Sequence, residues 1–268
     1  MIRLLLSDVD GTLVRKDKLL TERTVQAVHG LHDAGIDFAL TSGRPPRGMA
    51  MLVEPLDLRG PLAGFNGGLV VDPDLDVLEE HAIADELVPR AIRLLEESGL
   101  YVWAYRGNDW YVSDPDAPRV DRESHTLQFE PTVLESFDSL GPGVAKIVGV
   151  SDDLDAVATA ERRIGDALGE GVSAATSQPY YLDITHPRAN KGAVVDFLAR
   201  RYEVPRESIA TIGDGRNDVL MFSRSGLSIA MGNAHPDVQH AAHHVTTTNE
   251  DDGFANAVDR YILGHAGV

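Results

Sequence analysis

The stretch LLLSDVDGTLV, residues 4–14, places two aspartates two positions apart at the end of an apolar run. The run predicts a buried strand over residues 2–8 that ends at Asp8. Side chains two positions apart in extended backbone point to the same side, so we expect Asp8 and Asp10 to face one site. A glycine and a threonine follow at once, which adds a tight turn and a hydroxyl group.

Two simpler explanations of this acidic pair have to be weighed. An EF-hand calcium loop requires glycine at its sixth position and glutamate at its twelfth. Counted from Asp8, these positions hold Leu13 and Leu19, which excludes that loop. The other explanation is that Asp8 and Asp10 lie at a solvated junction between strand and loop. Motifs elsewhere in the chain distinguish this explanation from a shared site.

Short apolar runs alternate with helical patterns on both sides of a middle segment. Before it, the pattern predicts helices over 21–35 and 45–56 and strands over 36–42 and 61–65. After it, the pattern predicts helices over 191–202 and 217–225, from Pro236 and at the C-terminus, and strands over 208–214, 226–231 and 244–248. This alternation favours an α/β fold, a doubly wound parallel sheet with helices on both faces. Such sheets bind ligands beyond the carboxyl ends of their strands.

The middle segment has a different pattern. It predicts helices over 85–99 and 153–168, a hairpin of 100–105 with 110–114, and strands over 144–150, 171–177 and 180–185. We therefore expect residues 1–82 and 187–268 to form one core domain, and residues 83–186 to form an inserted α+β cap domain.

Composition narrows the classes of function. The 268 residues carry a formal net charge of −18, which argues against general attraction to nucleic acid or to an anionic membrane. A small anion remains a suitable ligand where local cations gather, and the four lysines are Lys16, Lys18, Lys146 and Lys191. The absence of cysteine excludes disulfides and thiolate chemistry. The N-terminal apolar run is too short for a signal peptide and no stretch is long enough to span a membrane, so we expect a soluble cytoplasmic protein.

A second acidic cluster lies in TIGDGRND, residues 211–218. If its strand runs beside the first strand, Asp8, Asp10 and Asp214 converge, with Asp218 nearby. Carboxylates without a cation would repel one another and raise one another's pKa. A hard divalent cation relieves that repulsion, and Mg²⁺ is the usual choice where the ligands are oxygens and a phosphate is handled.

Two further motifs supply what a phosphate needs. In TSGR, Ser42 offers a hydroxyl, and Gly43 lets backbone N–H groups approach an anion closely. Lys191 stands at a helix start, where its charge and the helix dipole both favour an anion. Taken singly, Ser42 is explained as a helix cap and Lys191 as a surface lysine. Four such motifs, each at a predicted strand end or helix start, indicate one shared site.

Together these motifs resemble the haloacid-dehalogenase-like (HAD) phosphohydrolase superfamily. The matching positions are Asp8, Asp10, Gly11 and Thr12 in D-x-D-G-T, Ser42 in S-G-R, Lys191 in N-K-G, and Gly213, Asp214, Asn217 and Asp218 in G-D-x-x-N-D. Ser42 stands where threonine is commoner, which keeps the hydroxyl. The insertion, with FNGG at 65–68 and AMGNA at 230–234, is similar to the α+β cap of the Cof-like, type IIB branch, on a Rossmann-like core.

The resemblance implies a Mg²⁺-dependent phosphatase for small phosphorylated metabolites, with sugar phosphates favoured. Asp8 would attack phosphorus to form an aspartyl-phosphate, and Asp10 would act as general acid and base. Asp8, the Asp10 carbonyl and Asp214 would hold the metal, with Asp218 at or just behind it. The remaining phosphate ligands would be Ser42, Gly43, Arg44 and Lys191, and Asn217 would position Lys191 or a phosphate oxygen. The acid role requires Asp10 to hold a proton near neutral pH, which we expect a neighbouring carboxylate to achieve.

The cap is expected to select the substrate. Asn66 and Asp183 are candidate substrate contacts. The aromatic residues Trp103, Tyr105, Trp110 and Tyr111 are interpreted first as packing of the cap sheet, with stacking on a substrate as the alternative. Arg119, Arg122 and His125 fall in a stretch predicted to be irregular, which is interpreted first as solvated surface, with contact to a second anionic group as the alternative.

Three other functions stay open from the sequence. A phosphohexomutase-like transferase would keep both aspartates of the first motif. A non-catalytic sensor of phosphorylated metabolites would have no need of an acid or base at Asp10, and a structural protein would expose an apolar patch. The expected partner is a small phosphorylated metabolite, with no nucleic acid and no membrane, and a monomer is the default state.

Overall fold

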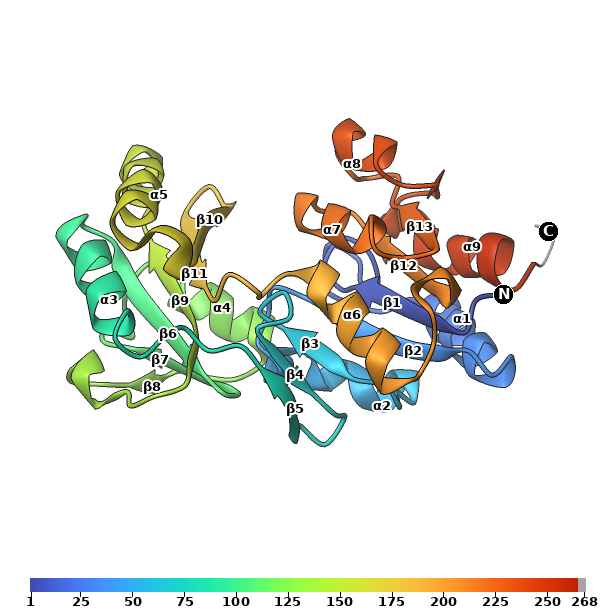
Figure 1. Ribbon diagram of the computed structural model, residues 1–268, viewed down its shortest axis with the longest axis horizontal. Coiled ribbons are helices and arrows are strands. Elements are labelled where there is room, and N and C mark those ends of the chain that lie inside the picture. Colours follow the sequence, from blue (N-terminus) through green and yellow to red (C-terminus); the bar gives the residue numbers. More distant parts are fainter. Residues whose placement is uncertain (265–268) are drawn as a thin grey trace.

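The computed structural model describes residues 1–264, which form a core body and a cap body side by side (Figure 1). The core takes the two outer parts of the chain and the cap takes the middle. Each body is built on its own sheet.

Within the described residues the core sheet has eight strands in the order β14-β13-β12-β1-β2-β3-β4-β5. Their bounds are β1 (Leu4–Asp8), β2 (Asp37–Thr41), β3 (Leu62–Gly64), β4 (Leu69–Val71), β5 (Val77–Glu80), β12 (Ile209–Gly213), β13 (Leu227–Ala230) and β14 (His244–Val245). The strands from β14 to β3 are parallel, which confirms the predicted sheet. The antiparallel pair β4 and β5 is an addition that the sequence pattern did not predict, because its apolar runs are too short to stand out.

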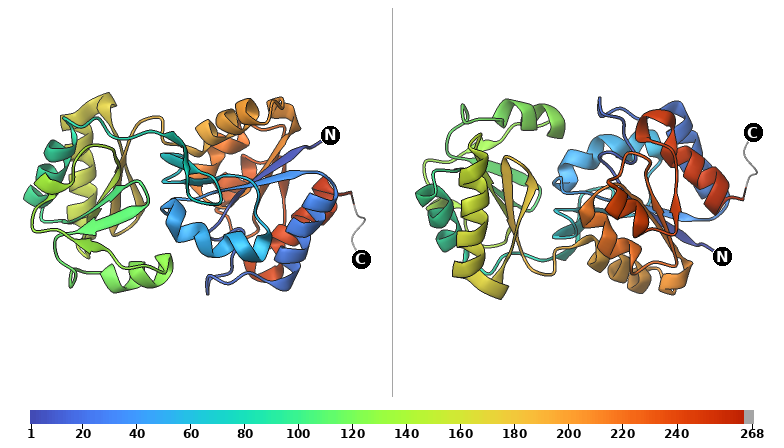
Figure 2. Two further views of the ribbon diagram at one scale, coloured as in Figure 1. Left: turned by 90° about the horizontal axis from the view of Figure 1, so that it is seen from below. Right: turned by 90° about the horizontal axis from the view of Figure 1, so that it is seen from above.

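Helices cover both faces of the core sheet, as predicted (Figure 2). One face carries α1 (Glu22–Asp33), a 3-10 turn over 46–52, α2 (Val53–Leu56), α9 (Gly253–Ala257) and a π-helical turn over 258–262. The other face carries α6 (Lys191–Arg201), α7 (Val219–Phe222) and α8 (Pro236–His240). The alternation within β1 explains the two layers, because Leu5 packs with the first group while Leu4 and Leu6 pack with the second.

Side-chain caps fix where two of these helices begin. Thr21 accepts a hydrogen bond from the Thr24 N–H at 3.1 Å, which confirms the predicted start of α1. Asn190 accepts one from the Ala193 N–H at 3.0 Å, so α6 begins at Lys191. The hydrogen bond that Asn190 accepts thus places Lys191 at the first position of α6.

The cap sheet has six strands within the described residues, in the order β10-β11-β9-β6-β7-β8. They are β6 (Tyr101–Arg106), β7 (Asp109–Val112), β8 (Thr132–Val133), β9 (Val144–Val150), β10 (Ser173–Gln178) and β11 (Tyr181–Thr185). The helices α3 (Val88–Glu97) and α5 (Leu154–Leu168) cover the face that is turned away from the core (Figure 1).

A third cap helix, α4 (Val120–Leu127), corrects one prediction. The stretch that includes Arg122 and His125 was expected to be irregular, but it forms two helical turns. Only Val120, Ser124 and Leu127 on this helix are buried, so its apolar periodicity was too weak to recognise in the sequence. Leu127 packs close to Gly48 of the core.

Linkers over 81–87 and 186–190 join the two bodies. Every described strand before the first linker or after the second belongs to the core sheet, and every strand between them belongs to the cap sheet. The aromatic rings of Phe65 in the core and Tyr105 in the cap lie 5.2 Å apart between centroids, which ties the bodies together. We propose the domain boundaries near 82 and 186 on this basis.

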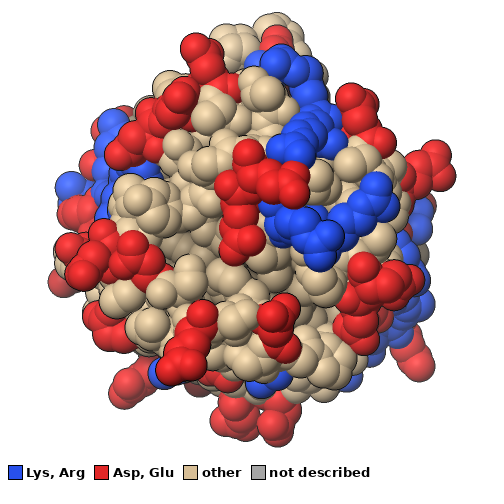
Figure 3. Space-filling model, turned by 90° about the vertical axis from the view of Figure 1, so that its left-hand side faces the viewer, with Lys and Arg blue, Asp and Glu red and all other residues tan. Residues whose placement is uncertain are grey.

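The outer end of the cap has acidic side chains spread across it, with one larger group of basic side chains to the upper right of centre and others at the edges of the view (Figure 3). This agrees with the negative net charge of the whole chain. Among residues 1–264, no helix is both long enough and apolar enough to cross a membrane.

Candidate active site

The carboxyl ends of β1 and β12 bring three aspartates together. The two strands are parallel neighbours, with Ser7 opposite Ile212, so the residues that follow them meet at one edge of the sheet. Asp8, Asp214 and Asp218 each offer a carboxylate oxygen, and these oxygens lie within 4.8 Å of one another. The convergence of Asp8 with Asp214 is therefore present in the structure.

Lys191 lies between two of these carboxylates. Its Nζ donates to Asp8 Oδ1 at 2.5 Å and to Asp218 Oδ1 at 2.6 Å, and the residue is 1% exposed. Burial lowers the pKa of Lys191, but attraction to Asp218 and Asp8 outweighs burial and raises it. The lysine is therefore a buried cation, not the surface lysine of the simpler explanation.

Asp218 uses both oxygens within the protein. Its Oδ1 binds Lys191, while its Oδ2 accepts hydrogen bonds from the N–H groups of Asp214 and Gly215 at 2.9 and 2.8 Å. The residue is fully buried. Asp218 thus orients Lys191 and the loop that carries Asp214.

The electrostatics of Asp8 and Asp214 fit a divalent cation. Burial raises the pKa of Asp8 well above its usual range, against the attraction of Lys191. Burial and then repulsion from Asp218 raise the pKa of Asp214 to about 6. Lys191 is one cation among the three carboxylates of Asp8, Asp214 and Asp218, so negative charge is left over, and oxygen donors of this kind are the ligands that Mg²⁺ prefers. The donor set suits a hard divalent metal without naming which one.

Gly11 and Asn233 position Asp214. The Asn233 side-chain amide donates to the Gly11 carbonyl oxygen at 2.9 Å and to Asp214 Oδ2 at 3.2 Å. Gly11 has a φ of +79°, and a Cβ at this position would lie 2.3 Å from Asp214 Oδ2. The glycine is therefore required by backbone conformation and by space.

We expect a Gly11→Ala variant to lose at least about tenfold in metal affinity, because the new methyl group displaces the Asp214 carboxylate. The same change at Gly35 is the control, since it also has a positive φ, of +69°, but nothing lies within 4 Å of a Cβ there. Titration of each variant with Mg²⁺ by calorimetry checks this. Equal metal affinity in the two variants would show that the contact with Asp214 is unimportant.

Asp10 differs from its expected state. Arg44 binds it with two hydrogen bonds, from Nε to Oδ2 at 2.7 Å and from Nη2 to Oδ1 at 2.6 Å, and Lys18 Nζ lies 2.6 Å from Oδ1. Burial raises the pKa of Asp10, but Arg44 and Lys18 outweigh it and lower the pKa to about 2. The expectation that a neighbouring carboxylate keeps Asp10 protonated is therefore wrong, because Asp10 is paired with the two cations Arg44 and Lys18.

Arg44 also connects the core to the cap. Its Nη1 donates to the carbonyl oxygens of Gly48 and of Thr126 in α4, at 3.3 and 3.2 Å. Arg44, which the sequence predicted as a phosphate ligand, is thus hydrogen-bonded to Asp10 and to the cap helix α4. The sequence analysis counted Lys18 among the lysines but did not assign it to the site, because it follows the first motif in a loop that has no recognisable pattern.

The predicted phosphate ligands surround the same edge of the sheet. Ser42 is buried directly after β2, and its Oγ accepts from the Arg44 N–H at 3.2 Å. Asn66 donates its backbone N–H to the Ser42 carbonyl oxygen at 2.8 Å and accepts from the Asn217 amide at 2.9 Å. A Cβ on Gly43 would lie 3.9 Å from the Asn66 amide nitrogen. These residues form one loop cluster beside Lys191.

The cap contributes an ion pair of its own. Lys146 Nζ lies 2.7 Å from Asp183 Oδ2, and both residues are at least nine-tenths buried. The sequence analysis assigned Asp183 to the site but not Lys146, although Lys146 is the one charged residue in the apolar strand VAKIVGV. Trp103, Tyr105 and Trp110 are buried and pack on one another, which confirms their interpretation as packing of the cap sheet.

The core is a parallel sheet with the buried set of Asp8, Lys191 and Asp218 at its carboxyl edge, beside an inserted cap. These features define an enzyme of the doubly wound α/β class. The chain belongs to the haloacid dehalogenase-like hydrolase family, whose model matches residues 5–258. The predicted superfamily is therefore confirmed, and so is the prediction of a phosphatase-type enzyme.

Curated relatives of the chain are phosphatases. A 5-amino-6-(5-phospho-D-ribitylamino)uracil phosphatase of Bacillus subtilis is 28% identical, covering 95% of each chain. An HMP-PP phosphatase of Cronobacter sakazakii is 26% identical, covering 89% of this chain and 87% of its own.

Solved structures share the whole fold. A haloacid dehalogenase-like hydrolase from Bacteroides thetaiotaomicron has a TM-score of 0.90 at 27% identity, covering 97% of this chain and 99% of its own. A subclass IIB sugar phosphatase has a TM-score of 0.83 at 21% identity, covering 97% and 98%. The arrangement of core and cap predicted for the type IIB branch is thus found in known structures.

Proposed function

We propose that this protein is a Mg²⁺-dependent phosphatase that hydrolyses small phosphorylated metabolites through an aspartyl-phosphate, with sugar or polyol phosphates as the favoured substrates. The observation that carries the proposal is the buried set of Asp8, Lys191 and Asp218. Lys191 engages only Oδ1 of Asp8. This fixes the direction of the carboxylate and leaves its second oxygen to attack phosphorus.

Asp8, the backbone carbonyl of Asp10 and Asp214 would hold the metal, and Asp218 would keep Lys191 and the 214–215 backbone in place. A bound Mg²⁺ neutralises charge on the transferring phosphoryl group. Lys191 supplies a fixed positive charge on the same side, next to the nucleophile.

Asp10 would handle the proton on the leaving oxygen and then on the attacking water. The ion pairs with Arg44 and Lys18 keep it ionised but make it a weak base, because they hold its pKa low. The first half requires a proton on the same carboxylate, so one of these ion pairs has to loosen when substrate enters. Arg44 is the residue that couples this change to the cap, through the Thr126 carbonyl oxygen.

Ser42, Gly43 and Asn217 would complete the phosphate site. The hydroxyl of Ser42, the backbone at Gly43 and the amide of Asn217 lie in one loop cluster held by Asn66. The relative from Bacillus subtilis acts on a phosphoribityl compound, which supports a hydroxylated substrate for this chain. We propose that the cap, residues 83–186, opens about its two linkers to admit it.

The first experiment is phosphate release from a panel of phosphorylated metabolites, with Mg²⁺ or with EDTA. We expect release from at least one sugar or polyol phosphate, and a loss of more than about 100-fold in EDTA, since the acidic site then lacks its cation. Full activity in EDTA would contradict the metal requirement. Binding of panel members without release would favour a sensor instead.

A further inference from the structure

The chain crosses between core and cap at two short linkers (Figure 1). At the first, the His81 N–H donates to the carbonyl oxygen of Gly68, in the uncharged turn FNGG of the core, at 2.7 Å. The Ile83 N–H then donates to the Val144 carbonyl oxygen of the cap at 2.8 Å. The return crossing, residues 186–190, leads from β11 to the start of α6. Any opening of the cap has to bend the chain at these two places.

Each crossing begins with a histidine, and the two histidines pack on one another. His81 directly follows β5, and His186 directly follows β11. Their rings are stacked, with 5.6 Å between centroids and 27° between planes, and both residues are half-buried. One pair of imidazole rings therefore joins the two linkers.

The hydrogen bonds of this arrangement require an uncharged ring at His186. Its Nδ1 accepts from the Arg188 backbone N–H at 3.0 Å, and a ring nitrogen that accepts carries no proton. A charged imidazole has two donors and no acceptor, so protonation of Nδ1 breaks this bond. Protonation of His186 is therefore incompatible with the observed conformation of the second linker.

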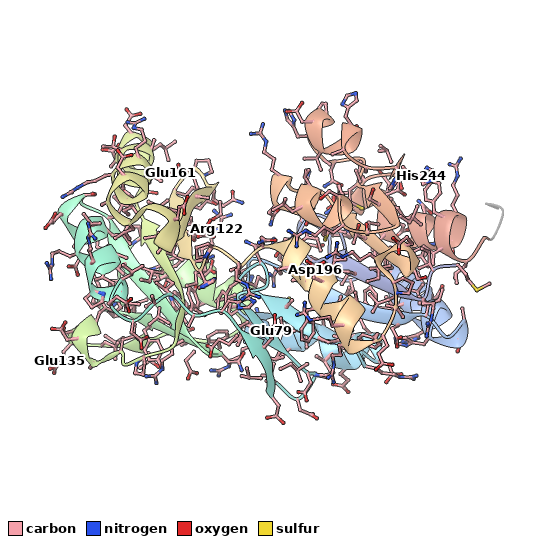
Figure 4. All side chains as sticks on the ribbon, viewed as in Figure 1. Glu79, Arg122, Glu135, Glu161, Asp196 and His244 are labelled. Carbon is pink, nitrogen blue, oxygen red and sulfur yellow. The ribbon has the colours of Figure 1, made fainter. Side chains whose placement is uncertain are left out.

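The charges around the pair compensate a proton on one ring only. His81 Nε2 lies 3.1 Å from Glu79 Oε1, and Glu79 lies at the junction of core and cap (Figure 4). Arg200 of α6 shares that carboxylate at 3.2 Å. The charged groups that act on His186 are His81 and Arg188, and neither attracts a proton. A second proton on the stacked pair is therefore uncompensated.

The direction of the pH effect follows from these contacts. Burial, then His81 and Arg188, lower the pKa of His186. When the linkers separate, the ring leaves these surroundings and its pKa returns toward the ordinary value of about 6.5. A proton thus binds more tightly to the separated linkers than to the stacked ones. The stacked arrangement is fully favoured above about pH 6.5 and is weakened as the pH falls from there through the lowered pKa.

We propose that His81 and His186 form a pH-sensitive hinge, which holds the cap closed at neutral pH and lets it open in acidic solution. The closed state is that of this structure, in which Lys146 of the cap donates to the Gly43 carbonyl oxygen of the core at 3.5 Å. Protonation of both rings places like charges on neighbouring linkers, which then move apart. The inference goes beyond the proposed function and uses only the opening of the cap from it.

Energy transfer between two dyes measures the opening. Because the chain has no cysteine, Ala158→Cys on α5 of the cap and Ala241→Cys beside α8 of the core provide two exposed labelling sites (Figure 1). The measurement is made with Mg²⁺ and without substrate. We expect the ratio of closed to open molecules to fall at least about fivefold from about pH 7.5 to about pH 5.5.

Two variants remove the charge and keep the hydrogen bonds. In His186→Asn the amide oxygen replaces Nδ1 as acceptor, and the ratio should change less than about twofold. In His81→Gln the amide nitrogen replaces Nε2 as donor to Glu79, and the change should stay below about threefold, since only the repulsion between the rings is lost. His29→Gln, at an exposed histidine of α1, is the control with the native response. Asp214, with a pKa of about 6, titrates in the same range, but every variant retains it.

The hinge is overturned if the native ratio changes less than about fivefold, or if a folded variant of the pair keeps the native response. The proposed function is tested separately by phosphate release at about pH 7.5, where both variants should stay within about threefold of the native rate, because both histidines lie outside the site. Phosphate release without pH-dependent opening leaves the function standing and removes the hinge. Opening that depends on pH, without phosphate release, leaves the hinge standing and removes the function.

Discussion

An Asp8→Asn variant is expected to stay folded and to release phosphate at least about 10³-fold more slowly than the native protein. The amide has the shape of the carboxylate but is not a nucleophile, so no aspartyl-phosphate forms. Lys191 keeps its second partner, Asp218, at 2.6 Å, and for that reason the buried lysine remains compensated. The loss should appear in kcat, with little change in substrate affinity.

Stopped assays of phosphate release with Mg²⁺, beside a thermal melt of each protein, measure this effect. Asp37→Asn serves as the matched control, because Asp37 begins the neighbouring strand β2 at its amino end, away from the site. Trapping with ³²P-labelled substrate provides an independent check, since only the native protein should carry label on Asp8. Label in the Asn variant, or activity within tenfold of native, would remove Asp8 from the role of nucleophile.

A Lys191→Met variant is expected to lose both activity and stability. Methionine fills the same volume without charge, which leaves Asp8 and Asp218 buried and uncompensated. Removing one partner of a buried ion pair costs about 3–5 kcal/mol. Activity should fall at least about 10³-fold, because the fixed cation beside the transferring phosphoryl group is lost.

Urea unfolding in EDTA measures the loss of stability separately from the loss of activity, and it is done for Lys191→Met with and without a second substitution, Asp218→Asn. The double variant Lys191→Met with Asp218→Asn removes one of the two uncompensated charges, so it should recover part of the lost stability without recovering activity. Lys16→Met, at an exposed lysine, is the control and should change neither. A Lys191→Met protein as stable as the native one would show that the ion pairs are worth little.

The order of elements was readable from the sequence because parallel sheets leave a strong signal. β1, β2 and β12 are buried on both faces, so each is a continuous apolar run followed by polar residues. Asp8, Ser42 and Asp214 directly follow such runs, and this is why their position at one edge could be anticipated. The hairpin of β4 and β5 and the helix α4 were not predicted, because short or weakly amphipathic elements take their stability from contacts that are distant in sequence.

The site, like the fold, was predictable from the sequence only in part. The residues of the motifs were recognisable, but their ionisation was not. Asp10 was expected to be protonated, and the structure surrounds it with Arg44 and Lys18, from separate parts of the chain. Lys146 and Asp183 are 37 positions apart, and only the pairing of β9 with β11 brings them together.

The sequence by itself determined the α/β core, the inserted cap and the identity of the acidic and cationic groups at the strand ends. These follow from local periodicity and from chemistry carried within single short motifs. The tertiary structure alone decided which charges pair, namely Lys191 with Asp8 and Asp218, Arg44 with Asp10, and Lys146 with Asp183. Electrostatic energies depend on distance and burial in space, and neither is encoded in the spacing of residues along the chain.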